Sequence, residues 1–167
     1  MSQPSLPRVL FLCTGNSARS ILAECLLRDR GAGRFESCSA GSQPKHEPHP
    51  AALALLEEKG HAIAGLRSKS WDEFGGPAAT PLDFIFTVCG NAAAETCPVW
   101  PGHPASAHWG IDDPAAVEAP PEAVRAAFEK AYSEMEERVE AFLALPFDTL
   151  SAEALAQRLR AIGTRGK

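Results

Sequence analysis

Near its amino terminus the chain passes from an apolar run through a short polar loop into a helical pattern. The apolar run covers residues 9–12, the loop covers 13–20, and the helical pattern covers 21–27. A continuously apolar run suits a strand that is buried on both faces. A strand followed so closely by a helix indicates an α/β fold built on a parallel sheet.

Three further strands and three further helices are predicted along the chain. The strands are expected at 35–40, 82–88 and 106–109, and the helices at 50–60, 121–142 and 150–162. This alternation predicts a three-layer αβα domain with a parallel sheet of about four strands. We assign residues 1–145 to this domain, and residues 146–167 to a C-terminal extension made of a short helix and a tail. Residues 42–50 and 75–81 are rich in Pro and Gly and are expected to be surface loops.

The composition excludes several classes of protein. A length of 167 residues suits one domain with a real hydrophobic core. The formal net charge of −5, without a basic patch, argues against nucleic acid as a partner. No apolar run is long enough to span a membrane, and the first residues lack the core of a signal peptide. We therefore expect a cytoplasmic protein, and we predict neither a metal site nor a cofactor.

The loop 13–20 has the sequence Cys-Thr-Gly-Asn-Ser-Ala-Arg-Ser and suits a tetrahedral oxyanion. Backbone N–H groups at the start of a helix bind anions, and Arg19 adds a planar fork of donors. Gly15 permits the backbone angles that an anion-binding loop often needs. The expected oxyanion-binding residues are Thr14, Gly15, Asn16, Ser17, Ala18 and Arg19.

Cys13 is the predicted nucleophile of this loop. The helix and Arg19 would lower the pKa of the thiol from about 8.5 toward roughly 5–7. Ser20 can donate a hydrogen bond toward the sulfur, and the amide of Asn16 can hold the shape of the loop. The alternative is an idle cysteine at a strand end beside a surface arginine. A nucleotide-binding loop fits worse, because no Gly-Lys-Ser/Thr follows.

The other four cysteines divide into two pairs. Cys89 ends the strand expected at 82–88, at the same edge of the sheet as Cys13, and Cys97 follows after a loop. Two thiols around a loop at this edge suggest thiol–disulfide exchange. The alternative is a simple surface loop with one buried and one incidental cysteine. Cys25 and Cys38 are expected to pack in the core.

The Cys-x5-Arg-Ser loop after the first strand resembles the signature of the low-molecular-weight protein tyrosine phosphatases. Their general acid is an Asp directly before a Pro late in the chain, which matches Asp113, with Asp112 as the neighbouring alternative. Together with Cys89 and Cys97-Pro98, the run His-Trp-Gly-Ile-Asp-Asp-Pro at 108–114 resembles the arsenate reductases of this fold, particularly the thioredoxin-coupled type. The resemblance covers most of residues 8–145.

The resemblance implies a reduction of arsenate, or binding of its near-identical analogue phosphate. Cys13 would attack arsenate held by the loop and Arg19, while Asp113 protonates the departing oxygen. Cys89 would then attack Cys13 and release arsenite, and Cys97 would move the disulfide to Cys89–Cys97. Thioredoxin, or glutaredoxin with glutathione, would reduce that disulfide. The implied catalytic residues are Cys13, Arg19, Ser20, Cys89, Cys97 and Asp113.

The chain departs from the family pattern at three places. Ala18 stands where relatives usually have Cys, and the interval from Cys89 to Cys97 is one residue longer than in the best-known members. The family's potassium-site pattern is matched at Asn16, Glu24 and Ser39, but its later Asp is replaced within residues 68–71. The identity of the reductant and any activation by potassium are therefore left open.

Two other functions compete with the reductase. One is a phosphatase acting on phosphotyrosine or a small phosphoester. Phosphatases of this fold often place an aromatic residue after the Asp-Pro, where this chain has Ala115-Ala116, and this favours the reductase. The other is a zinc-binding module, whose loosely spaced ligands would be Cys89, Cys97, His103 and His108. The remaining histidines, His46, His49 and His61, are expected in or near surface loops.

Overall fold

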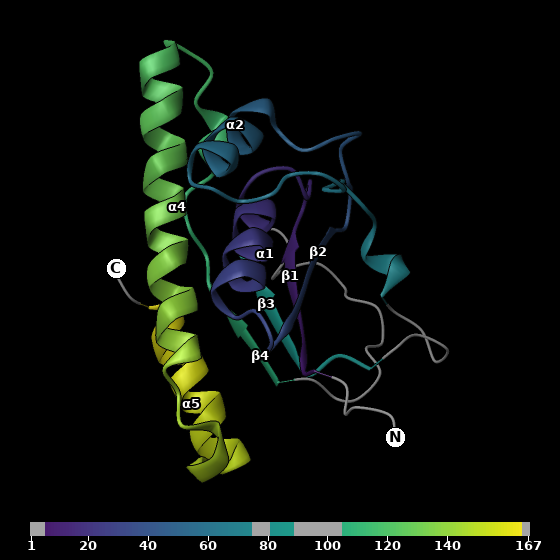
Figure 1. Cartoon of the computed structure of the whole chain (residues 1–167), viewed down its shortest axis with the longest axis vertical. Helices are drawn as coiled ribbons and strands as arrows, with labels where there is room; N and C mark the ends of the chain where they lie inside the picture. The colour runs from purple at the N-terminus through teal and green to yellow at the C-terminus, as the bar shows by residue number, and fades with distance from the viewer. Residues whose placement is uncertain (1–5, 75–80, 89–104, 165–167) are drawn as a thin grey trace.

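Four parallel strands form the sheet at the centre of the structure (Figure 1). They are β1 (Arg8–Cys13), β2 (Glu36–Gly41), β3 (Phe84–Thr87) and β4 (Ala105–His108), in the order β2-β1-β3-β4. The computed structural model describes residues 6–74, 81–88 and 105–164. The predicted parallel sheet of four strands is confirmed, and the strand bounds differ only slightly from those expected.

In the described residues four helices accompany the sheet, each close to a segment predicted as helical. They are α1 (Arg19–Arg30), α2 (Pro50–Glu58), α4 (Pro121–Leu143) and α5 (Ala152–Gly163), with short 3-10 turns η1 (Trp71–Glu73), η2 (Pro114–Ala116) and η3 (Phe147–Thr149). Helix α1 ends before Gly31 and carries Arg28 and Arg30 in its last turn, where positive charge suits the helix dipole. Ser151 caps α5, since its side chain accepts a hydrogen bond from the Ala154 N–H.

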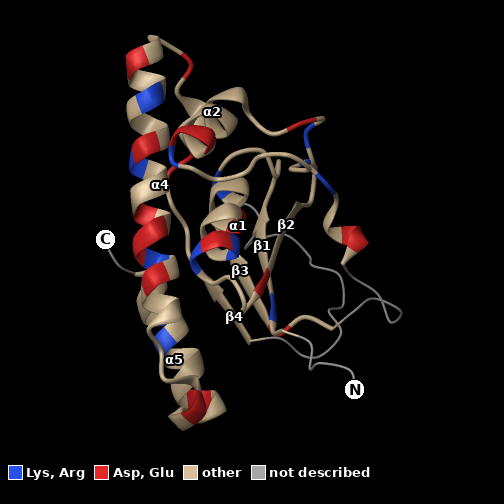
Figure 2. Cartoon of the chain, viewed as in Figure 1, with Lys and Arg blue, Asp and Glu red and all other residues tan. Residues whose placement is uncertain are grey.

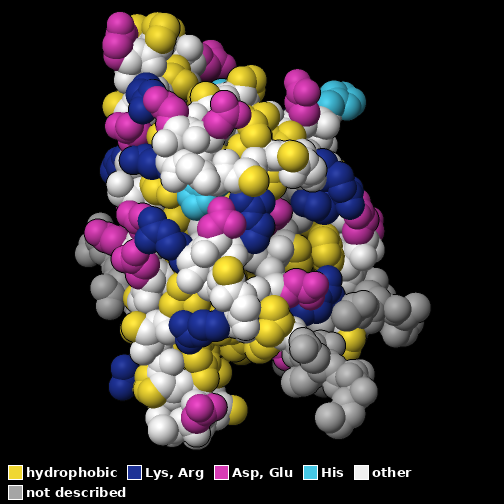
Figure 3. All heavy atoms as spheres, viewed as in Figure 1, with side chains coloured by type: hydrophobic (Ala, Val, Ile, Leu, Met, Phe, Trp, Pro, Cys, Tyr) yellow, Lys and Arg dark blue, Asp and Glu magenta, His cyan; other side chains and the backbone are white. Residues whose placement is uncertain are grey.

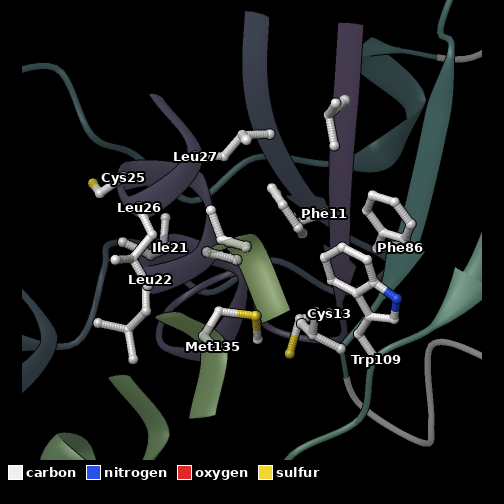
Figure 4. Packing of buried hydrophobic residues seen from close by; sticks show 14 of the residues in the cluster. Phe11, Cys13, Ile21, Leu22, Cys25, Leu26, Leu27, Phe86, Trp109 and Met135 are labelled. Carbon is white, nitrogen blue, oxygen red and sulfur yellow. The ribbon is translucent and has the colours of Figure 1, made fainter. Parts of the chain in front are cut away.

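The core surrounds β1, whose residues 9–12 are fully buried. Burial of consecutive residues means that both faces of the strand are covered. On one face Phe86 stacks on the indole of Trp109 with ring centroids 3.7 Å apart, and Phe11 lies beside both rings (Figure 4). Phe142 brings α4 onto this cluster. Such aromatic contacts add to the stability gained from apolar burial.

Charged side chains are spread along α4 and over the rest of the visible surface. Acidic and basic residues are interspersed along α4, with the acidic ones more numerous (Figure 2). Figure 3 shows both signs interspersed on this face of the molecule. None of the helices in the described ranges is both long and apolar enough to cross a membrane.

The strand register brings the carboxyl ends of the strands to one edge of the sheet. Cys13 lies opposite Gly41, while Thr87 of β3 lies beside both Leu12 and His108. Ligands of such sheets bind at this edge, outside the ends of the strands. The site that we describe next lies there.

Candidate active site

Cys13 lines a hollow of about 300 Å³ at the carboxyl edge of the sheet. The residue is almost completely buried, with 4% exposed. The hollow combines the predicted loop with a distant acid and with part of the chain after β2; its lining residues are Cys13, Thr14, Gly15, Ser17, Ala18, Arg19, Gln43, Lys45, Asp113 and Ala115. A thiol, a guanidinium and a carboxylate therefore share one small cavity.

The segment that follows β2 holds the loop from outside. Backbone N–H groups of Gln43, Lys45 and His49 donate to the carbonyl oxygens of residues 14, 15 and 17 at 2.9, 2.9 and 2.8 Å. In a trans peptide the N–H points opposite to the carbonyl. The N–H groups that follow these carbonyls therefore point away from the segment, as an anion-binding loop requires. Residues 42–50 were expected to be only a surface loop, and their contact with residues 14–17 was missed.

Gly41 allows the loop to pack this closely. A Cβ at Gly41 would lie 2.4 Å from the carbonyl oxygen of Thr14 and 3.0 Å from the backbone nitrogen of Asn16. No side chain fits there, so only glycine can end β2 at this position.

Asn16 is the residue that fixes the shape of the loop. Its backbone adopts the left-handed region with φ of 46°, which Asn tolerates better than most residues. Its buried side-chain amide donates to Ser20 Oγ at 2.8 Å and to Ser39 Oγ at 2.9 Å. Gly15 was expected to permit the backbone angles that such a loop needs, but the positive φ lies at Asn16. Gly15 instead makes room for Lys45, since a Cβ there would lie 3.3 Å from Lys45 Cε.

Ser20 lies fully buried in the first turn of α1. Its hydroxyl accepts the hydrogen bond from Asn16, so its own proton can be donated elsewhere. Donation toward the sulfur of Cys13 stays a prediction.

Arg19 connects the loop to the chain that precedes Asp113. One terminal nitrogen donates to the carbonyl of Ile111 at 3.2 Å, and the other lies 3.5 Å from the Asp113 carboxylate. Its Nε is buried and has no hydrogen-bond partner among the residues that the structure describes. A buried donor without an acceptor costs free energy. A tetrahedral oxyanion beside Cys13 would supply that acceptor.

Asp113 and Asp112 lie in different surroundings although they are adjacent. Asp113 lines the hollow, and its carboxylate also accepts a hydrogen bond from the Ala115 N–H at 3.0 Å. Asp112 is 95% exposed at its side chain and lies 3.7 Å from Lys130. Of the two candidates, only Asp113 can reach an anion bound in the hollow.

The chain before Asp113 is fixed to the core through Trp109. The indole is fully buried and donates to the carbonyl of Leu159 in α5 at 2.9 Å. The Trp109 N–H donates to the carbonyl of Thr87 at 2.7 Å, and Thr87 Oγ1 lies 2.8 Å from His108 Nδ1. Asp113 therefore extends from a rigid support rather than from a free loop.

Of the four further cysteines, two are described. Cys25 and Cys38 pack in or against the core, and burial raises the pKa of each thiol to about 12. Both thiols therefore stay protonated and unreactive at neutral pH. Cys25 lies on the far side of α1 from Cys13 (Figure 4). Cys89 and Cys97, which the sequence predicts as redox partners, lie outside the described residues.

The zinc alternative concerns residues that are mostly outside the described ranges, namely Cys89, Cys97 and His103. The fourth candidate, His108, hydrogen-bonds Thr87. Among the described residues no three His, Cys, Asp or Glu side chains are grouped to hold a metal ion.

His61 lies in the irregular segment after α2, as expected, but it is buried. Its Nδ1 contacts Asp29 of α1 and its Nε2 lies 2.7 Å from the Tyr132 hydroxyl of α4. This histidine connects two helices and lines no part of the hollow.

Sequence reasoning did not identify Gln43 and Lys45 as residues of the site. Both follow Gly41, the last residue of β2, at the same edge as Cys13. The rule that parallel strands end at one edge could have found them. Lys45 adds a positive charge to the lining of the hollow.

Comparison with known protein families places the fold, including the loop 13–20, in one family. The family model of low molecular weight phosphotyrosine protein phosphatases matches residues 8–158. The chain belongs to this family.

Within the family, arsenate reductases are similar to this chain. It is 35% identical to an arsenate reductase of Shouchella clausii and 34% identical to one of Bacillus subtilis, each over 80% of this chain and 93% of the relative. A solved arsenate reductase in its phosphate-binding state superposes with a TM-score of 0.67 at 29% identity, covering 83% of this chain and 98% of that one. A thioredoxin-dependent arsenate reductase of Corynebacterium glutamicum gives a TM-score of 0.58 at 26% identity, over 83% of this chain. This chain spans 62% of that longer protein.

Proposed function

We propose that this protein reduces arsenate to arsenite. The observation that carries the proposal is the grouping of Cys13, Arg19 and Asp113 around one small hollow, with the buried Nε of Arg19 lacking an acceptor among the described residues. A phosphatase would use the same three groups. The choice of arsenate is supported by the curated relatives that bear the name arsenate reductase and by the small Ala115 in the hollow.

The first step in this proposal forms a bond between sulfur and arsenic. The thiolate of Cys13 attacks As(V) while Arg19 and the loop N–H groups hold the other oxygens. Asp113 gives a proton to the departing oxygen, which leaves as water. Arsenic remains As(V) in the thioester-like adduct.

The second step transfers two electrons to arsenic. The thiolate of Cys89 attacks the sulfur of Cys13, and the S–As bond breaks with its electron pair on arsenic. Arsenite leaves as As(III), and a Cys13–Cys89 disulfide remains. Val88 is the last described residue before Cys89, and its N–H donates to the carbonyl of Leu12, one residue before Cys13. This contact supports Cys89 as the partner of Cys13.

The last step regenerates the enzyme. The thiolate of Cys97 attacks Cys89, frees Cys13 as a thiol and leaves a Cys89–Cys97 disulfide, which an external dithiol of the thioredoxin type reduces. One structural neighbour is a thioredoxin-dependent arsenate reductase, which supports this reductant. Such thiol chemistry needs a reducing compartment, so we place the protein in the cytoplasm.

The test is arsenate-dependent oxidation of NADPH, coupled in parallel through thioredoxin and through glutathione with glutaredoxin. We expect turnover with thioredoxin, and loss of turnover in Cys13→Ser, Cys89→Ser and Cys97→Ser. Cys38→Ser is the matched control and should keep full activity, because its thiol is protonated and lies outside the hollow.

Hydrolysis of p-nitrophenyl phosphate, measured on the same proteins, separates the two functions. Fast hydrolysis that is unchanged in Cys89→Ser, without arsenate-dependent oxidation of NADPH, would show a phosphatase. Turnover by Cys97→Ser with glutathione and glutaredoxin would keep arsenate reduction but refute the thioredoxin step.

A further inference from the structure

Lys69 places an almost completely buried ammonium group directly beside the oxyanion loop. Its side chain is 10% exposed, and it lies in the segment between Gly65 and η1. The ammonium donates to the carbonyl oxygens of Ser39 at 2.8 Å and Arg67 at 3.0 Å, and lies 3.5 Å from Asn16 Oδ1. Three donors thus meet three acceptors, which is the full capacity of an ammonium group.

The carboxylate of Glu24 balances this charge. Its Oε1 lies 3.8 Å from Lys69 Nζ, and its side chain is 15% exposed. Burial lowers the pKa of Lys69, and the negative charge of Glu24 opposes that shift. The pair is therefore a fixed element of the loop's surroundings rather than a solvated surface contact.

Asn16, Glu24 and Ser39 are the residues that match the family's potassium-site pattern, and they surround the ammonium of Lys69. A metal ion bound to the same oxygens would overlap the ammonium, since Ser39 and Asn16 already contact it. The residues present therefore do not fit a resident potassium ion.

We propose that the ammonium of Lys69 acts as a built-in monovalent cation that positions Asn16 and so keeps the oxyanion loop ready for its anion. Lys69 is a positioning residue, because its contacts are with Asn16 and not with the hollow. The backbone of the same segment acts alongside: the Lys69 N–H donates to Asn16 Oδ1 at 2.9 Å, and Ser68 Oγ donates to the Asn16 carbonyl at 2.6 Å. These contacts hold the left-handed backbone of Asn16, which would otherwise be unfavourable.

The charge of Lys69 has a second effect on the bound anion. Without it, Glu24 would be a nearly buried carboxylate without its ammonium, close to a loop that must accept a negative ion. Loss of one partner from such a pair leaves an uncompensated charge. We therefore expect anion binding to weaken when the ammonium is removed, even where the fold is kept.

Two substitutions with different volumes test this role. Lys69→Met keeps the length of the side chain without its charge, while Lys69→Ala leaves a void that a small cation can enter. The readout is phosphate affinity from titration calorimetry, which does not depend on arsenate reduction and so fails separately from the proposed function. We expect phosphate to bind about tenfold or more weakly to both variants.

Phosphate affinity measured in salts of different cations then shows whether Lys69 acts through its positive charge or only by filling space. Ammonium or potassium chloride should restore most of the phosphate affinity of Lys69→Ala but not of Lys69→Met, and tetramethylammonium chloride at the same ionic strength should restore neither. Lys59→Ala, which removes an exposed lysine at the C-terminal end of α2 that does not line the hollow, is the control and should bind phosphate like the wild type.

The salt dependence of the wild-type protein tests the same proposal without relying on the folding of a variant. Its phosphate affinity and arsenate turnover should be equal in potassium, sodium and tetramethylammonium chloride. The proposal is overturned by severalfold activation of the wild type by potassium, by normal phosphate affinity in Lys69→Met, or by a lack of recovery of Lys69→Ala in both small-cation salts.

Discussion

The carboxylate of Asp113 lies 3.5 Å from the Arg19 guanidinium and keeps 41% of its side chain exposed. An anion entering the hollow would compete with this carboxylate for Arg19. A general acid must reach the leaving oxygen in its protonated form. The position of Asp113 meets the geometric part of this requirement, and that of Asp112 does not.

Asp113→Asn should therefore lower kcat for arsenate by about a hundredfold or more, since general acid catalysis contributes on that scale. Phosphate affinity should not fall, because Arg19 loses a competing carboxylate. Asp112→Asn is the matched control, with kcat close to wild type. Equal losses of kcat in both variants would show that Asp113 has no special role.

For single residues, the sequence predicts the position of side chains within one loop better than their contacts with residues far along the chain. Cys13 and Arg19 could be assigned from the sequence, because a strand-to-helix loop fixes where both must lie. The sequence indicated Gly15 as the residue with backbone freedom in this loop, whereas the left-handed backbone lies at Asn16. The reason is that Ser39, Ser68 and Lys69 hold Asn16, and a local pattern does not reveal contacts with residues so far along the chain.

Helices α1 and α4 are joined by a partly buried polar chain through His61. Asp29 at the end of α1 contacts one ring nitrogen, and the Tyr132 hydroxyl of α4 lies 2.7 Å from the other. Each of the two ring nitrogens thus has a partner in a site with little access to water. The link fixes the two helices that pack on each other beside the sheet (Figure 1).

Tyr132→Phe should reduce the free energy of unfolding by about 1–3 kcal/mol, because it leaves a ring nitrogen of His61 without its partner. Chemical denaturation of both proteins measures this difference. Arsenate turnover per folded molecule should be unchanged, because the link lies outside the hollow. An unchanged free energy of unfolding would contradict the structural role of this contact.

The free energy of unfolding at acid pH should depend on the carboxylate of Asp29. The hydrogen bond from Arg28 and, to a smaller extent, that from His61 lower the pKa of Asp29 from 3.8 to about 2. A carboxyl with a lowered pKa in the folded state stabilises the fold above its unfolded pKa. That contribution is lost as the pH falls from 3.8 to about 2. Asp29→Asn should lose less stability than the wild type over this interval in acid denaturation, and parallel curves would refute the assignment.

The helices and strands could be predicted from local patterns, but the contacts between them could not. The apolar stripe of α4 and the first-turn proline of α2 are visible in the sequence. The role of the chain after β2 is not, because its backbone hydrogen bonds to residues 14–17 leave no trace in composition. Proline and glycine in 42–50 correctly indicate irregular structure but say nothing about what it touches.

The C-terminal helix α5 contributes to the part of the molecule that carries the site. Its Leu159 carbonyl accepts the indole hydrogen bond of Trp109. A Cβ at Gly163 would lie 2.2 Å from the carbonyl oxygen of His108, so the last turn of α5 presses on the end of β4. The sequence assigned no function to this helix, and the structure connects it to the chain that leads to Asp113.

Gly163→Ala should therefore force α5 away from β4 and lower the free energy of unfolding by about 1–3 kcal/mol, as overpacking commonly does. Turnover per folded molecule should fall as well, since Trp109 supports the chain that carries Asp113. Ala161→Ser, on the exposed side of the same helix, is the control and should change neither quantity. Full stability and activity in Gly163→Ala would show that α5 is not coupled to the site.

The central claim, that a thiol-based site passes two electrons to arsenate, is tested most directly by a single turnover without any external reductant. Fully reduced protein is mixed with excess arsenate, and arsenite is quantified together with the free thiols that remain. The mechanism predicts one arsenite released per chain and the loss of two thiols, with neither change in Cys13→Ser. Absence of arsenite, or arsenite formed without loss of thiols, would contradict it.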